Sequence, residues 1–257
     1  MKATVPEWFE ILDDATEKVM RRIAAASASN SMSLQVKYSP TLAYWFICDT
    51  LSLANQANRE GMHANALSLT RQCIEAVSVI EVGICNHPDA EAMLLKWDAD
   101  RATAGEMRKW LQANVWVNYG TGLWNEPWDV FMRELAAAIQ PYAHYGRNLA
   151  QWQLRFHGSV DIAEDCTAGA EGLMMELRPR AYDAQKATRI TLFHGLLTYV
   201  LGRVWMSSNP ADGHFDALMG RLGKALGASR YLDGHATDWS QQFWATLWER
   251  GGGTILE

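Results

Sequence analysis

The sequence predicts an all-α protein, a multi-helix bundle built around two long buried helices at about residues 63–85 and 181–206. Apolar residues recur at spacings of three and four along most of the chain, which is the helical period. Both long segments are apolar around most of their circumference, as in helices at the centre of a bundle. No segment shows strong strand alternation. We expect one helical domain over residues 1–257, with helices 7–26 and 239–250 docked either peripherally or at a dimer interface.

The first long helix, residues 63–85, keeps one narrow polar stripe on its otherwise apolar surface. Residues four apart are neighbours on a helix, so Arg71 and Glu75 are expected to form a pair. The pair either faces solvent or lies in a pocket, and the sequence leaves both interpretations open. The stripe consists of Ser68, Arg71, Glu75 and Ser78.

The second long helix, residues 181–206, carries a similar polar stripe around His194. His194 is interpreted either as a core histidine that bonds a threonine hydroxyl or a backbone carbonyl, or as part of a functional site. Gly195 and Gly202 share a face of this helix and would allow another helix to approach closely. The stripe consists of Thr191, His194 and Thr198.

The N-terminal half contains four further predicted segments. Residues 7–26 form an amphipathic helix, and the small polar residues 26–33 form a linker. A helix over residues 40–58 begins with a proline, which is favoured in a first turn. Two shorter helices cover residues 89–98 and 104–117.

The C-terminal half is less regular. A helix over residues 126–140 is kinked or ended by Pro141, which lacks an N–H and crowds the preceding turn. Aromatic residues at spacings of three and four then predict a continuous helical stripe over residues 142–156. Residues 158–178 fit a helix weakened by two glycines, and a loop or hairpin is an open alternative. A glycine-interrupted helix follows at residues 214–226.

The composition limits the functional classes. The formal net charge of −6 argues against broad electrostatic binding to nucleic acid. Four scattered cysteines without a C-x-x-C motif indicate neither a structural zinc nor a thioredoxin-like motif. Three of them lie in apolar helical runs as small buried hydrophobic residues, which fits a reducing compartment. Acidic residues fall where a signal peptide would be apolar, and no apolar run is long enough to span a membrane. We therefore expect a cytoplasmic protein that does not contact membranes.

Motifs for common cofactors are absent from the sequence. There is no Walker A loop, no Gly-x-Gly-x-x-Gly after a strand and no Gly-x-Ser-x-Gly elbow. The only Glu-x-x-His pair, Glu60 with His63, crosses a predicted turn, whereas a di-iron bundle needs two such pairs on facing helices. We expect neither a metal nor another cofactor.

Two motifs carry a resemblance to a known family. An Arg-x-x-x-Glu lies in an apolar helix, and a Tyr-Ala-His-Tyr-x-Arg segment follows later in the chain. Over about residues 40–205 the chain thereby resembles uncharacterised bacterial all-helical proteins of the HEPN-like kind. These proteins are helical bundles, often dimers, and many are metal-independent ribonucleases that use Arg-x(4–6)-His. The residues concerned here are Arg71, Glu75, Tyr142, His144, Tyr145 and Arg147.

The resemblance implies candidate catalytic and binding residues. Arg189 with His194, and Arg230 with His235, have the family's spacing. In this interpretation a histidine, His194 or His144, acts as general acid or base on a ribose hydroxyl, and arginine holds the phosphate. The candidate catalytic residues are Arg189, His194 and His144, and the candidate binding residues are Arg71, Glu75, Tyr142, Tyr145 and Arg147.

Two functions remain from the sequence. The first is a non-catalytic interaction module that forms a homodimer and binds a protein partner. The twelve tryptophans and the amphipathic helix 239–250 favour it, because aromatic residues are enriched at interface cores. The alternative is a HEPN-like ribonuclease of a toxin or phage-defence type, and only this alternative has RNA as a partner.

One contact is predicted between the Arg71–Glu75 pair and the residues around His144. The buried helix 63–85 needs a polar partner for Arg71 and Glu75 if they are not solvated. We expect a side-chain atom of Tyr142, His144 or Tyr145 within hydrogen-bond reach of that pair.

Overall fold

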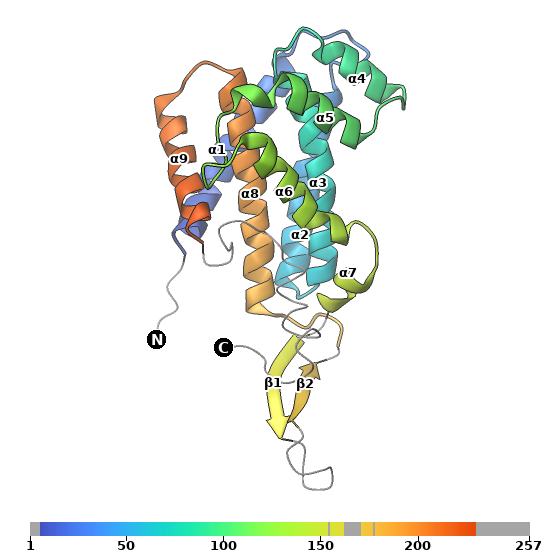
Figure 1. The fold of residues 1–257 in the computed structure, drawn as a ribbon, viewed down its shortest axis with the longest axis vertical. Helices are drawn as coiled ribbons and strands as arrows, with labels where there is room; N and C mark the ends of the chain where they lie inside the picture. The colour runs from blue at the N-terminus through green and yellow to red at the C-terminus, as the bar shows by residue number, and fades with distance from the viewer. Residues whose placement is uncertain (1–5, 154, 162–170, 177, 230–257) are drawn as a thin grey trace.

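The computed structural model describes residues 6–153, 155–161, 171–176 and 178–229. The predicted all-α bundle is confirmed, and a small two-stranded hairpin projects from one end of it (Figure 1). The elements are α1 (Glu7–Ser29), α2 (Ser39–Arg59), α3 (His63–Ile84), α4 (Ala90–Asp98), α5 (Ala104–Asn114), η1 (Trp116–Asn118), α6 (Trp128–Ile139), η2 (Gln140–Tyr142), α7 (Arg147–Gln151), β1 (Arg155–Asp161), β2 (Glu171–Glu176), α8 (Ala184–Ser208) and α9 (Gly213–Gly227).

The two long helices predicted from the sequence, α3 and α8, form the centre of the bundle (Figure 1). α2 lies along α3, and α1 lies along α8. α9 covers α1 and α8, whereas α4, α5 and α6 pack on α3. This order follows from the apolar circumference of α3 and α8, which must be covered by other helices on several sides. α1 runs to Ser29 and so includes the first part of the segment predicted as a linker.

The turn between α2 and α3 is fixed against the segment that enters α8. Gly61 has a φ of +76°, and a Cβ built on it would lie 2.7 Å from the carbonyl oxygen of Arg180. Nε2 of His63 accepts the backbone N–H of Asp183 at 2.9 Å, and its Nδ1 lies 2.9 Å from Oδ1 of Asn58. These bonds hold the start of α8 against the start of α3, so the two central helices are connected at this end by buried polar contacts.

Glycines also allow close helix packing on α8, as predicted. A Cβ on Gly195 would lie 3.2 Å from Leu226 of α9 and 3.5 Å from Leu12 of α1. A Cβ on Gly202 would overlap the side chain of Met219 in α9. A side chain at Gly202 would therefore displace Met219, and one at Gly195 would need only a small shift of Leu226.

The helix predicted over residues 142–156 is wrong. Pro141 lies in the 3-10 turn η2, the chain bends through residues 143–146, and α7 covers only Arg147–Gln151. Gly146 is extended at the N-terminus of α7, so the helix restarts there instead of continuing from Tyr142. Phe156, the last residue of the predicted stripe, lies on strand β1.

The hairpin alternative for residues 158–178 is confirmed where the structure describes them. β1 and β2 are antiparallel, with Arg155 opposite Glu176 and Asp161 opposite Glu171. The register shifts between Phe156 and Gly158, which marks a bulge in β1.

Several sequence predictions lie outside the described residues. These are the last helix at residues 239–250, the Arg230–His235 spacing and Cys166. Within the described ranges, no helix is long and apolar enough to cross a membrane.

Candidate functional site

His194 lies on α8 and is 6% exposed, at the meeting point of three helices. Its Nε2 is 2.7 Å from the hydroxyl of Thr70 on α3, and its Nδ1 is 3.0 Å from Oδ1 of Asn55 on α2. The hydroxyl of Thr70 also lies 2.8 Å from the carbonyl oxygen of Ala66, so its single proton has two acceptors within reach, and the tautomer of His194 sets the direction of both hydrogen bonds to the ring. The interpretation as a core histidine bonded to a threonine hydroxyl is confirmed.

This environment bears on the proposed catalytic role of His194. Burial lowers its pKa to about 4, so the ring is neutral at pH 7. A neutral ring with both nitrogens engaged has no proton ready for a leaving group and no free lone pair for a ribose hydroxyl. Arg189 lies one and a half turns earlier on the same helix and is partly buried. The geometry of this pair supports packing better than phosphoryl chemistry.

The Arg71–Glu75 pair forms as predicted, with 2.8 Å between Nη2 and Oε1. The arginine side chain is 12% exposed and the glutamate side chain is 48% exposed, so the pair lies at the edge of the bundle. Arg71 also donates to Oε1 of Gln140 at 3.0 Å. The partner from the region around Pro141 is thus Gln140. In the described residues no hydrogen bond joins Arg71 or Glu75 to Tyr142, His144 or Tyr145, so the predicted contact is wrong.

The predicted contact with the Arg71–Glu75 pair fails because the helix expected over residues 142–156 is interrupted. A helix through residues 142–156 would have carried these side chains along α3, but the chain bends through residues 143–146 after η2. Tyr142 is buried against Trp152, with ring centroids 5.9 Å apart, whereas His144, Tyr145 and Arg147 are exposed. Tyr145 donates to Gln153 at 3.2 Å. The structure therefore does not assemble the candidate catalytic and binding residues into one site.

The most unusual surface of the described chain is the outer face of α2, which we call the α2 face. Its apolar side chains are large and strongly exposed: Leu42 and Trp45 are each 57% exposed, and Leu53 is 55% exposed. The opposite side of the same helix packs on the core through Ile47, Leu51 and Ala54. The α2 face consists of Tyr38, which precedes the helix, and Leu42, Trp45, Phe46, Asp49 and Leu53.

A groove of about 970 Å³ lies between α1, α2 and α8. Its floor includes His194, and Thr16 of α1 bonds Thr198 of α8 across it at 3.1 Å. The polar stripe predicted on α8 thus lines a groove, but its hydroxyls already have partners: Thr198 bonds Thr16, and Thr191 donates to the carbonyl of Ala187 at 3.0 Å. These contacts indicate a structural role for the stripe.

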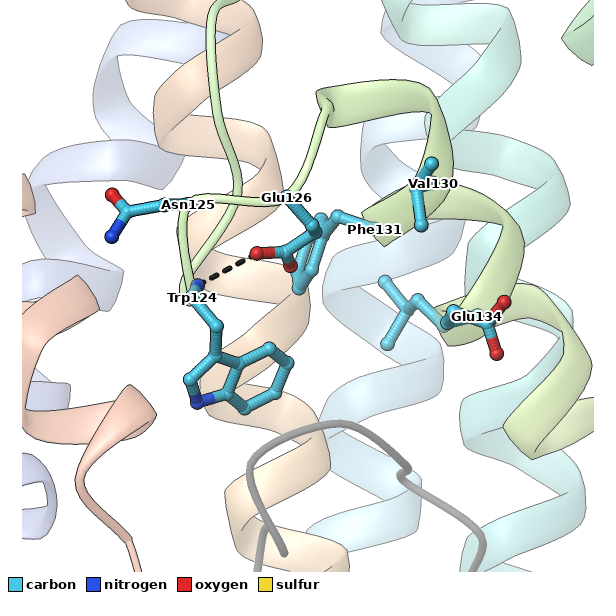
Figure 2. A pocket seen from close by; sticks show the side chains of 7 residues that line it. Trp124, Asn125, Glu126, Val130, Phe131 and Glu134 are labelled. Carbon is cyan, nitrogen blue, oxygen red and sulfur yellow. Dashed lines mark hydrogen bonds between the residues drawn. The ribbon is translucent and has the colours of Figure 1, made fainter.

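A smaller hollow of about 260 Å³ lies where the 119–127 loop enters α6 (Figure 2). Figure 2 shows the indole of Trp124 on one side, with Phe131 and the carboxylate of Glu126 above it. Oε2 of Glu126 accepts the N–H of Trp124 at 2.7 Å, and the indole N–H donates to the carbonyl of Gly227 at 3.0 Å. The carboxylate of Glu126 and the indole of Trp124 are thus hydrogen-bonded within the protein, and these two bonds stabilise the 119–127 loop.

One buried acidic residue was not singled out from the sequence. Glu81 of α3 is 1% exposed, and its Oε1 accepts the indole N–H of Trp116 at 2.9 Å. Burial raises its pKa to about 7, against the opposing effect of hydrogen bonding by Tyr119 and Trp116. The signal was present, because Glu81 falls on the same helical row as Leu67 and Val77. A carboxyl on an apolar row is expected to need special partners.

Within the described residues, no group of three or more histidine, cysteine, aspartate or glutamate side chains could hold a metal ion.

Comparisons with models of protein families, with curated proteins and with solved structures find no match. The HEPN-like resemblance stays a prediction, and the functional argument depends on the geometry of this chain.

Proposed function

We propose that the protein is a non-catalytic helical module that forms a homodimer through the α2 face. The observation that carries the proposal is the exposure of five large apolar side chains on one face of a helix that is packed firmly on its other side. Exposed apolar patches of this kind mark interaction sites on folded proteins. Tryptophan and tyrosine are also the residues that contribute most to binding at interface centres.

A symmetric pair of antiparallel α2 helices suits the order of residues on the face. In a twofold interface the same patch is used by both copies. With the axis between Trp45 and Phe46, these two rings would pack on each other across the axis. Tyr38 would then lie opposite Leu53 of the second copy.

Asp49, the one charged residue of the α2 face, limits where the twofold axis can lie. Two Asp49 side chains at the axis would repel each other in a desolvated interface. With the axis between Trp45 and Phe46, the two aspartates lie seven residues apart along the helix direction, which is about 10 Å. That separation weakens the repulsion between them relative to a position at the axis.

Sedimentation velocity over a range of protein concentrations tests the dimer. We expect the native protein to sediment as a dimer at about 100 μM, and Trp45→Glu to sediment as a monomer, because hot-spot residues at an interface contribute about 2–4 kcal/mol. Val117→Glu is the matched control, since Val117 is 71% exposed but lies on η1. A monomeric native protein, or an equal effect of both substitutions, would refute the proposal.

Cross-linking tests the position of the axis. In a background without native cysteines, Phe46→Cys should form an intermolecular disulfide, because this residue lies beside the axis. Leu53→Cys should not, since two copies of residue 53 lie about 22 Å apart along the helix direction in this arrangement. The reverse result would exclude the antiparallel pairing centred on Trp45 and Phe46.

A further inference from the structure

A small polar cavity lies where the C-terminal ends of three helices meet. Its volume is about 230 Å³, and it is separate from the α2 face and from the groove at His194. α3 ends at Ile84, α5 at Asn114 and α8 at Ser208, and the residues around these ends form the walls. The lining residues are Cys85, Asn86, His87, Pro88, Asn114, Val115, Asn118, Tyr119, Ser207 and Ser208.

The surroundings of this cavity favour positive charge. The C-terminus of a helix carries a partial negative charge, which a cation normally offsets. None of the three helices has a basic residue in its last turn. Arg203 of α8, one turn earlier, is directed to the carbonyl of Tyr119 and to the hydroxyl of Tyr199 at 2.8 Å. No basic side chain in the last turns of these helices therefore offsets the partial negative charge at their C-terminal ends.

A buried carboxyl lies behind the cavity. Glu81 makes no ion pair in the part of the chain described, and Trp116 is its hydrogen-bond donor. The other titratable groups near it are the thiol of Cys85, whose pKa burial raises to about 11, and the phenol of Tyr119, whose pKa burial and the adjacent Glu81 raise well above the usual value. Both are neutral at pH 7, so neither compensates a charge on Glu81.

Tyr119 connects the buried carboxyl with the cavity. The residue is 5% exposed and lines the cavity, and its hydroxyl interacts with both Glu81 and Ser207. These interactions are longer or less well aligned than ordinary hydrogen bonds. A buried hydroxyl whose hydrogen bonds are poorly formed is costly, and it has one proton to donate and lone pairs to accept with.

We propose that this cavity binds a small organic ammonium ion, with the hydroxyl of Tyr119 as an acceptor and Glu81 as the counter-charge behind it. The Tyr119 hydroxyl donates to Glu81 and accepts one N–H of the ammonium group. Asn114 donates its Nδ2 to the carbonyl of Trp110 at 2.8 Å, which leaves its side-chain oxygen as a second acceptor. The three N–H groups of a primary ammonium match such a set of oxygens. An anion would be repelled by the helix ends and by Glu81.

The indole N–H of Trp116 reports binding directly, because it donates to Glu81. In ¹⁵N-labelled full-length protein at pH 8, ethylammonium chloride should shift this signal saturably, with Trp116→Phe used for assignment. Neutral 1-propanol of similar size should bind about tenfold more weakly or not at all, since it lacks the charge. Bound ethylammonium should also lower the pH midpoint of the Trp116 signal by about half a unit or more, because a nearby cation favours the ionised carboxyl.

Two variants separate this site from general effects. Glu81→Gln keeps a similar shape without charge and should weaken ethylammonium binding about tenfold, and Tyr119→Phe should weaken it by a similar factor. If Glu81→Gln does not fold, Tyr119→Phe alone decides. Tyr44→Phe removes a hydroxyl on α2, outside the cavity lining, and should leave binding unchanged. Equal shifts with 1-propanol or with potassium chloride, or no shift at about 50 mM ethylammonium, would overturn the proposal.

Discussion

Nε2 of His194 and the hydroxyl of Thr70 lie 2.7 Å apart, and this hydrogen bond joins the two long buried helices α8 and α3 inside the core. Thr70 is fully buried and His194 is 6% exposed. A bond between two neutral groups at such depth is worth little in itself, but the loss of one partner leaves the other unsatisfied. The histidine that the family resemblance selects as catalytic is thus a structural residue in this geometry.

Replacing Thr70 tests this bond. Thr70→Val keeps the shape but removes the hydroxyl that bonds Nε2 of His194, so the free energy of unfolding should fall by about 1–3 kcal/mol. Urea denaturation at pH 7.5 measures the change. Thr188→Val is the control, because its hydroxyl bonds the carbonyl of Ala184 at 2.8 Å on the exposed side of α8. A change in that variant above about 0.5 kcal/mol would show that the loss of a threonine hydroxyl destabilises the fold even away from His194.

The pH dependence of stability gives a second test of His194. Its pKa is lowered to about 4 by burial, below the usual value of 6.5. Between pH 6.5 and 4 the unfolded chain binds a proton at this residue and the folded protein does not. Its contribution is therefore unchanged above pH 6.5, and it destabilises the fold by up to about 3 kcal/mol as the pH falls to 4.

His194→Gln isolates this effect. The variant cannot be protonated, so its unfolding free energy should fall less between pH 7.5 and 4.5 than that of the native protein. His63, whose pKa burial also lowers to about 4, remains in both proteins and contributes the same slope to each. Identical slopes for the variant and the native protein would show that His194 is protonated normally in the fold.

Glu81 should produce the opposite dependence. Burial raises its folded pKa to about 7 from 4.5, so the folded protein holds this proton more tightly than the unfolded chain. The stabilisation is present below pH 4.5 and is lost as the pH rises through 7, by up to about 3 kcal/mol. Glu81→Gln should consequently be more stable relative to the native protein at pH 8 than at pH 5. Urea denaturation at both pH values measures this, with Glu134→Gln, at an exposed position of α6, as the control.

The sequence predicted the central helices well because their pattern is local. α3 and α8 are apolar around most of their circumference, and that periodicity is visible without knowledge of any neighbour. The hairpin remained one of several alternatives, since glycines in residues 158–178 weaken a helix without specifying a strand. The helix predicted over 142–156 does not form because Gly146 is extended before α7 and because β1 begins at Arg155, and the spacing of the aromatic residues shows neither feature.

The candidate site was less predictable because burial depends on partners far away in the sequence. α2 carries apolar residues on two faces, and only packing against α3 decides that Ile47 is buried and Trp45 is exposed. The cavity near Tyr119 is formed by the ends of α3, α5 and α8, which meet only in the folded protein. Glu81 alone gave a local signal, as a charge on an apolar helical row.

The turn before α3 should tolerate no side chain at Gly61. Its φ of +76° is in the left-handed region, which disfavours a Cβ, and the new atom would lie 2.7 Å from a backbone carbonyl oxygen at Arg180. That backbone leads into α8, and the side chain of Arg180 pairs with Glu60 at 3.0 Å. Gly61→Ala should lower the free energy of unfolding by about 3 kcal/mol.

Gly220 provides the matched control for this substitution. It lies exposed inside α9, and a Cβ there would meet no atom within 4 Å. Gly220→Ala should raise the free energy of unfolding by about 0.5–1 kcal/mol, because alanine loses less backbone entropy in a helix. Thermal and urea unfolding of both variants measure the contrast. If Gly61→Ala were as stable as the native protein, the α2–α3 turn could shift away from the segment that enters α8, and this contact would not hold the central helices together.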